Sequence, residues 1–156
     1  MARPAGDSML KKIMAQLEVE LKKIKTANDY VSNIVDEGVF RKVNAWKHFS
    51  VFPCVVITYA GGENDAMMNR SQKKTKTINL IFKLRDDGSS PLSDQIAELE
   101  YDLEYLLMQN PTLTTASGEK LVTYIRLMSD VSDQGAYDPF ASWTAVLEVR
   151  YYAKYL

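Results

Sequence analysis

The sequence predicts one α+β domain, in which an antiparallel or mixed β-sheet carries two amphipathic helices packed on one face. Two segments repeat apolar residues three and four apart, and several others alternate apolar with polar residues. Such helices and strands each bury one side, so they can share one core. No repeat or linker divides residues 1–156. We expect a single domain of this length to fold without metal or disulfide staples.

The first helix is predicted to begin after a cap at Asp7 or Ser8, whose side chains can accept hydrogen bonds from the first turn. Its apolar stripe consists of Leu10, Ile13, Met14, Leu17, Leu21 and Ile24. Its other face is basic, with Lys11, Lys12, Lys22, Lys23 and Lys25 against Glu18 and Glu20. Asn28 and Asp29 end the helix with turn residues. Residues 30–35 then favour a short strand.

A longer strand is predicted over residues 51–59, which are rich in β-branched and aromatic side chains. Pro53 indicates a strand beginning or a sheet edge, because proline lacks the N–H that a central strand needs. Gly61 and Gly62 are predicted to close this strand.

The segment from Gly61 to about Lys74 has no consistent period, and we expect a long, flexible loop there. From Lys76 the pattern becomes regular, because Ile78, Leu80, Phe82 and Leu84 alternate with Thr77, Asn79, Ile81 and Lys83. Two strands joined by one loop predict an antiparallel hairpin, with a long β-hairpin arm at about residues 61–76.

The second helix is predicted to begin near Pro91, with Ser90 as its cap, and to end at Asn110 and Pro111. Its apolar stripe is Leu92, Ile96, Leu99, Leu103, Leu106 and Leu107. Its polar face is acidic, with Asp94, Glu98, Glu100, Asp102 and Glu104 and no lysine or arginine. A basic and an acidic helix would each gain from lying near the other, within one subunit or between two.

Two further strands complete the predicted sheet. The first, over residues 121–128, alternates loosely and is followed by a polar loop with Asp130, Asp133, Gly135 and Asp138. The last has the clearest alternation, with Trp143, Ala145, Leu147, Val149 and Tyr151 predicted to face the core.

The sequence predicts a protein without enzymatic activity, cofactor or metal. His48 is the only histidine, so a multi-histidine zinc site is excluded. Cys54 lies in an apolar strand, where thiols are usually inert. Gly61 and Gly62 lack the spacing of a phosphate-binding loop, and the aspartates of the 130–138 loop miss EF-hand spacing. The acidic pair Glu98 and Asp102 is typical of a solvated helix face.

Composition constrains the partners and the compartment. The formal net charge is −1, which lacks the positive field of a general duplex-DNA binder. The single cysteine allows no internal disulfide, and no apolar run resembles a signal peptide or a membrane span. We therefore expect synthesis in a cytoplasm and no membrane partner.

The hairpin arm carries the residues that the sequence favours for docking. They are Met67, Met68, Arg70, Lys73, Lys74 and Lys76. Adjacent methionines are costly to leave in water and adapt well to a partner surface. The basic residues fit either an acidic surface or nucleic acid, and a solvated hairpin tip is the simpler interpretation.

Several segments in order along the chain resemble the tail terminator, or tail-completion, proteins of long-tailed bacteriophages. They are the opening helix with Tyr30-Val31, the strand segments Phe52-Pro53-Cys54-Val55-Val56-Ile57 and Thr77-Ile78-Asn79-Leu80-Ile81-Phe82, the helix end Leu106-Leu107-Met108-Gln109-Asn110, and the closing Ala145-Val146-Leu147-Glu148-Val149-Arg150-Tyr151-Tyr152. The resemblance covers nearly the whole chain. That family has no catalytic signature.

The resemblance implies a structural virion protein of the tail or neck, made in the host cytoplasm. It implies a homo-hexameric ring that caps the tail tube, stops its polymerisation and joins the head–tail connector. The partners would be further copies of the chain, the tail tube protein and the connector, with genomic DNA passing through the lumen without specific binding. The alternatives are another neck or tail-tube subunit, a small enzyme or ligand-binding domain with a pocket beneath Trp46 or Trp143, and a nucleic-acid-binding module that uses the basic loop.

Overall fold

A computed structural model describes residues 8–41, 50–86, 88, 90–133 and 139–154. Within these residues it contains two α-helices, α1 (Met9–Leu21) and α2 (Leu92–Gln109). The strands are β1 (Val39–Phe40), β2 (Cys54–Asn64), β3 (Ser71–Arg85), β4 (Tyr124–Ser132) and β5 (Phe140–Lys154). Two short 3₁₀ turns, Thr26–Asn28 and Asp36–Gly38, lie between α1 and β1.

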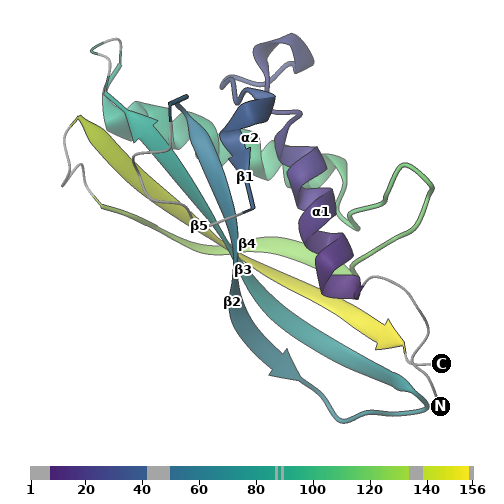
Figure 1. The fold of residues 1–156 in the computed structure, drawn as a ribbon. Coiled ribbons are helices and arrows are strands. Elements are labelled where there is room, and N and C mark those ends of the chain that lie inside the picture. Colours follow the sequence, from purple (N-terminus) through teal and green to yellow (C-terminus); the bar gives the residue numbers. More distant parts are fainter. Residues whose placement is uncertain (1–7, 42–49, 87, 89, 134–138, 155–156) are drawn as a thin grey trace.

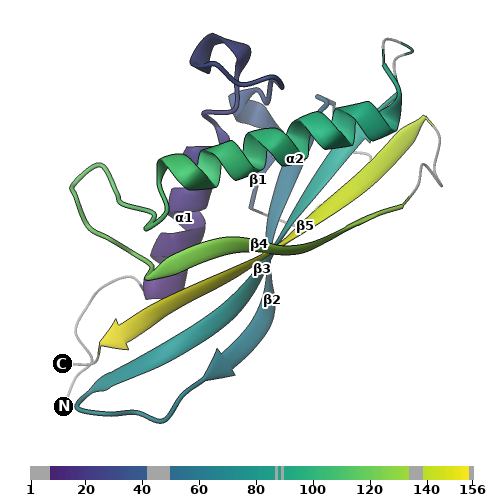
Figure 2. The same ribbon diagram turned by 180° about the vertical axis from the view of Figure 1, so that it is seen from behind.

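The five strands form one mixed sheet in the order β1-β2-β3-β5-β4. β1 runs parallel to β2, and the other neighbours are antiparallel. Both helices lie over the same face of this sheet, and neither covers its other face, which we call the uncovered face (Figures 1 and 2). On that face, Cys54 and Val56 are buried in a small second apolar cluster with Phe40, Val51, Phe52 and Ile81. The predicted α+β class, with a mixed sheet and two helices on one face, is confirmed.

The core lies between the helices and the covered face of the sheet. It is built from the stripes and alternations that the sequence predicts. The main buried members are Ile13, Leu17 and Leu21 on α1, Leu99, Leu103 and Leu106 on α2, Ile78, Leu80, Phe82 and Leu84 on β3, and Trp143, Ala145, Leu147, Val149 and Tyr151 on β5. Ser8 caps α1 by accepting a hydrogen bond from the Lys11 N–H, and Asn110 ends α2, both as predicted.

The strand predicted over residues 30–35 is wrong. The backbone N–H of Ile34 bonds to the carbonyl of Ile24, just beyond α1. The N–H groups of Val31 and Ser32 instead donate to the carboxylate of Asp102 on α2. These long-range partners replace a strand ladder, since backbone N–H groups need acceptors but not necessarily those of a neighbouring strand.

The long loop predicted from Gly61 to Lys74 is also wrong. β2 continues to Asn64 through a bulge between Tyr59 and Gly61, and β3 already begins at Ser71. The non-strand part of the hairpin arm is therefore confined to residues 65–70. Period-two patterning is lost here because the arm extends beyond the helices, as Figures 1 and 2 show, and has less core to face.

Smaller differences concern boundaries. β4 runs to Ser132, so Asp130 lies in a strand rather than in the predicted polar loop. Pro91, not Ser90, occupies the N-cap position of α2, and no side chain caps it. The two-residue β1 was not predicted. Trp46, His48, Gly135 and Asp138 lie outside the described residues.

Candidate assembly surfaces

The tip of the hairpin arm presents two methionines to solvent. Met67 is 56% exposed and Met68 is 73% exposed. The tip is closed by reciprocal backbone hydrogen bonds between Met68 and Ser71, each 2.8 Å long. Asn69 and Arg70, between them, adopt positive φ angles of 49° and 61°, the two-residue pattern of a tight hairpin turn. The turn therefore fixes the backbone of Met68, and Met67 directly precedes it.

The predicted basic residues of the arm do not form one patch. Arg70 is exposed at the tip. Lys73 pairs with Asp65, its Nζ lying 3.0 Å from Oδ2. Lys74 is half-buried, and its side chain points to the opposite face of β3 from that of Lys73. Lys76 is buried opposite Gly62, so its charge is not displayed at the tip.

A second exposed apolar surface, not predicted from the sequence, lies on α2. Tyr101, Tyr105 and Met108 are 64%, 38% and 75% exposed. Their spacing of four and three places them on one side of the helix, away from the leucine stripe. This same spacing is the signal that could have found them. Tyr30 supports the row from below, with its ring edge-on to that of Tyr105 at 5.4 Å between centroids.

Acidic side chains flank this row. Asp94, Glu98 and Glu104 are exposed. In the described part of the chain, none of these three carboxylates forms an ion pair. We call the surface made by Tyr101, Tyr105 and Met108 with these carboxylates the α2 face. It combines apolar area with unneutralised negative charge.

Asp102 does not belong to the α2 face, so the solvated Glu98–Asp102 pair is a wrong prediction. Asp102 is buried. Its Oδ1 accepts from the Val31 N–H at 2.9 Å and its Oδ2 from the Ser32 N–H at 2.6 Å. The carboxylate thus fixes the segment after α1 against α2.

Four lysines in or just after α1 form ion pairs with acidic residues that do not lie on α2. Lys12 pairs with Glu119, Lys22 with Glu18, Lys23 with Glu20 and Lys25 with Asp36. The expected attraction between a basic first helix and an acidic second helix is therefore not made by these four pairs within the subunit. The α2 face keeps its charge.

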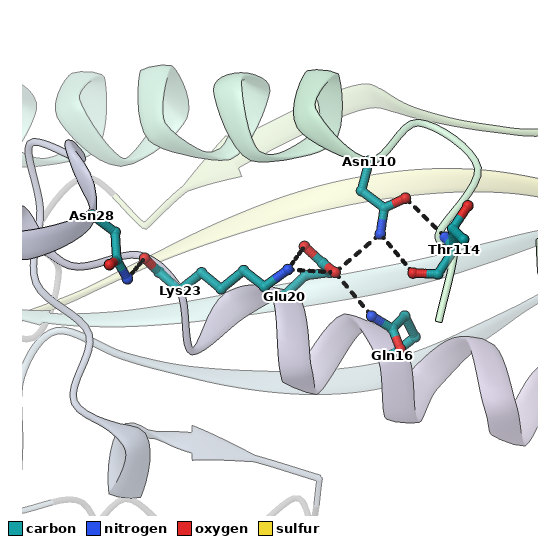
Figure 3. Close-up of polar contacts among 6 residues, drawn as sticks. All are labelled: Gln16, Glu20, Lys23, Asn28, Asn110 and Thr114. Carbon is teal, nitrogen blue, oxygen red and sulfur yellow. Dashed lines mark hydrogen bonds and ion pairs between the residues drawn. The ribbon is translucent and has the colours of Figure 1, made fainter. Parts of the chain in front are cut away.

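A buried carboxylate joins the ends of the two helices and fixes their relative position (Figure 3). Glu20 Oε1 accepts from Gln16 Nε2 at 2.8 Å, from Lys23 Nζ at 3.0 Å and from Asn110 Nδ2 at 3.0 Å. Asn110 also bonds the backbone of Thr114 through both its side-chain atoms. Because Glu20 is satisfied by several donors, its burial is compatible with a stable fold.

The uncovered face of the sheet carries a shallow polar depression. It is lined by Glu63, Asp65, Lys73, Thr75, Tyr124, Arg126, Glu148 and Arg150. The Tyr124 hydroxyl donates to Glu148 Oε1 at 2.5 Å, and Arg126 Nε donates to the same oxygen at 3.1 Å. The Arg150 guanidinium lies 4.8 Å from the centre of the Tyr124 ring. The depression is lined by three acidic and three basic side chains, so their formal charges cancel.

These contacts shift two pKa values in opposite directions. The hydrogen bond from Tyr124 is the main reason why the pKa of Glu148 lies below its ordinary value. The same hydrogen bond raises the pKa of Tyr124. At neutral pH the tyrosine therefore stays a donor and the glutamate an acceptor, a structural arrangement rather than one poised for proton transfer.

The remaining chemical candidates have structural roles. Burial raises the pKa of the Cys54 thiol to about 11, so it is an unreactive thiol at neutral pH. Asp130 accepts a hydrogen bond from the buried Trp143 indole at 2.8 Å, and Trp143 packs in the core rather than lining a pocket. Gly61 and Gly62 lie within β2.

Among the described residues, no three His, Cys, Asp or Glu side chains gather closely enough to hold a metal ion. Neither described helix combines the length and apolar character needed to cross a membrane.

The chain matches no model of a known protein family and no curated protein sequence.

Proposed function

We propose that the protein is a ring-forming tail terminator of a long-tailed bacteriophage. The observation that carries the proposal is that one subunit displays two unlike exposed surfaces, an apolar and acidic α2 face and a hairpin tip with Met67, Met68 and Arg70. A ring needs a heterologous interface, in which two different patches of the same subunit complement each other. The resemblance of several segments to tail terminators supports the same assignment.

A tail terminator stops tube growth because its ring is closed. A heterologous contact with a closing rotation produces a ring and then stops, whereas a tube grows by repeated stacking. A hexameric ring that binds the last layer of tail tube protein ends polymerisation there. Its opposite side receives the head–tail connector. Genomic DNA passes through the lumen without specific binding, for which a net charge of −1 is suitable. The working location is the tail or neck of the virion.

Solution mass and electron microscopy test this proposal. We expect closed rings, most simply hexamers, either with the protein alone at high concentration or on tubes assembled from the tail tube protein of the same genome. Negative-stain images should show a ring at a tube end. A subunit that stays monomeric and binds no tube contradicts the proposal. Long stacks of rings made by this protein alone would identify a tail-tube subunit instead.

A further inference from the structure

We propose that the hairpin tip of one copy, formed by Met67, Met68 and Arg70, docks on the α2 face of a second copy. This inference rests on the proposed ring, for which it names the two contacting surfaces. It commits to one occupant, because the chain itself supplies two surfaces with complementary properties.

The α2 face has the composition of an interface core. Tyrosine and methionine are enriched at protein interfaces, and a helical row of three large exposed side chains costs free energy in water. Tyr101 and Met108 are 64% and 75% exposed. Beneath the row, Asp102 and the Tyr30 ring fix the helix and the base of Tyr105. The surface is therefore preformed and needs little ordering on binding.

The hairpin tip is preformed too. Besides the two Met68–Ser71 backbone bonds, Gln72 Nε2 donates to the Asp65 carbonyl at 2.8 Å, and Lys73 pairs with the Asp65 carboxylate. These contacts stiffen the strand ends on both sides of the turn. An ordered tip loses less conformational entropy when its methionines enter a partner surface.

The charges of the two surfaces favour contact between a hairpin tip and an α2 face. Glu98 and Glu104 on the α2 face form no ion pair within the described residues. At the tip, Lys73 neutralises Asp65, while Arg70 has no anionic partner in that part of the chain. An Arg70 guanidinium beside these carboxylates gains attraction in a contact that excludes water. Two α2 faces or two tips would instead place like charges together.

The two surfaces of one subunit do not meet. Both ribbon views show the hairpin arm reaching away from α2, beyond the part of the sheet that the helices cover (Figures 1 and 2). The contact therefore joins different copies. Because the donor and acceptor surfaces differ and lie apart on each subunit, repetition of the contact leaves both available for the next copy, as a ring requires.

Disulfide trapping tests the contact directly. Met68→Cys and Met108→Cys are made as separate proteins and mixed under mild oxidation. Cys54 gives little background, since it is buried and its thiol pKa is about 11. We expect a crosslinked dimer from the mixture and much less from either variant alone. Lys120→Cys, an exposed loop position, replaces Met108→Cys as the matched control and should give no dimer.

A charge exchange provides the second measurement. Arg70→Glu and Glu104→Arg should each weaken self-association, measured by sedimentation, about tenfold or more, and the double variant should recover most of the loss. Lys120→Glu makes the same change of charge elsewhere and should not weaken it. Far-UV circular dichroism and thermal melting confirm that each variant is folded.

The outcomes separate this inference from the proposed function. Rings that form without the Met68–Met108 crosslink, and that tolerate Arg70→Glu, overturn the docking contact but leave the ring. A specific crosslink with open filaments instead of rings supports the contact and contradicts the terminator. Absence of both crosslink and assembly, with and without tail tubes, overturns both.

Discussion

At the scale of single residues, Asp102 and Glu148 show how carboxylates in this chain serve the fold. Asp102 accepts two backbone N–H groups from the segment after α1. Glu148 accepts from Tyr124 and Arg126 on the neighbouring strand. In each case the acceptor and its donors are far apart in sequence. The negative charge is matched to specific donors, so each position is sensitive to loss of one acceptor oxygen.

Replacing Asp102 with asparagine should lower the free energy of unfolding by about 1.5–3 kcal/mol, because hydrogen bonds to a charged acceptor are worth about that much. The amide oxygen can still accept from one N–H group, while its NH₂ faces the other donor. Urea unfolding measures the change. Glu98→Gln, on the exposed side of the same helix, is the control and should have little effect. Equal midpoints for both variants would show that Asp102 does not hold residues 30–35.

Glu148 should give the protein a pH-dependent contribution to stability. Its folded pKa is lowered, so the ionised form adds stability above the ordinary glutamate pKa of about 4.3, and this stability is lost as pH falls through the folded value. We expect Glu148→Gln to destabilise the protein at neutral pH and to converge with the wild type in acid. Urea midpoints between about pH 7 and pH 3 measure the difference.

A gap between Glu148→Gln and wild type that stays constant down to the acid limit would mean that Tyr124 and Arg126 do not favour the ionised carboxylate.

At the scale of elements, the β2–β3 hairpin depends on a glycine at position 62. A Cβ there would lie 2.3 Å from the Thr75 carbonyl oxygen and 2.7 Å from the Lys76 Cα. Both are backbone atoms of β3, so relief requires the strands to separate. A glycine inside a strand commonly marks such a close approach.

Gly62→Ala should therefore destabilise the protein by about 1–3 kcal/mol, as overpacking does. Hydrogen exchange should locate the loosening in the distal part of the hairpin. Gly38→Ala is the matched control, because a Cβ at that position meets its nearest neighbours at an ordinary 3.5 Å. If Gly62→Ala were as stable as Gly38→Ala, the strands would have room that the structure does not show.

At the scale of the whole molecule, the two helices cover one face of the sheet and not the other. Leu147 is fully buried beneath the helices, whereas the next residue back, Val146, points to the uncovered face and is half-buried. Their neighbours on β3 follow the same division, with Ile78 buried beside Leu147 and Asn79 opposite Val146. Among the described residues, the main core therefore lies on the helix-covered side of the sheet, and a smaller buried cluster around Cys54 and Val56 lies on the other side.

Leu147→Ala should cost about 2–5 kcal/mol, since it leaves a cavity in the core. Val146→Ala, one residue away, should cost about 1 kcal/mol, since it removes methyl groups that are only partly buried. Chemical denaturation compares the two. A smaller loss for Leu147→Ala than for Val146→Ala would reverse the assignment of the two faces.

The elements whose apolar residues repeat a simple period against the core are predictable from the sequence. The leucine stripe of α2 and the alternation of β5 predict buried faces, because each apolar residue there meets the same core. The sequence also indicates Met67, Met68 and Arg70 as candidate docking residues. These are local properties, set by spacing and side-chain type.

The distant partners of polar groups are visible only in the folded protein, because they depend on how the elements pack together. The helical spacing predicts that Asp102 is a solvated acid. In the structure its carboxylate accepts hydrogen bonds from the N–H groups of Val31 and Ser32. The sequence of the arm predicts a loop, because its side chains follow no period. In the structure β2 and β3 pair along the arm, since strand ladders also form where no core imposes a period. The α2 face is likewise recognisable only in the folded protein. Tyr101 and Met108 have helical spacing, but only the packing of the leucine stripe leaves them outside.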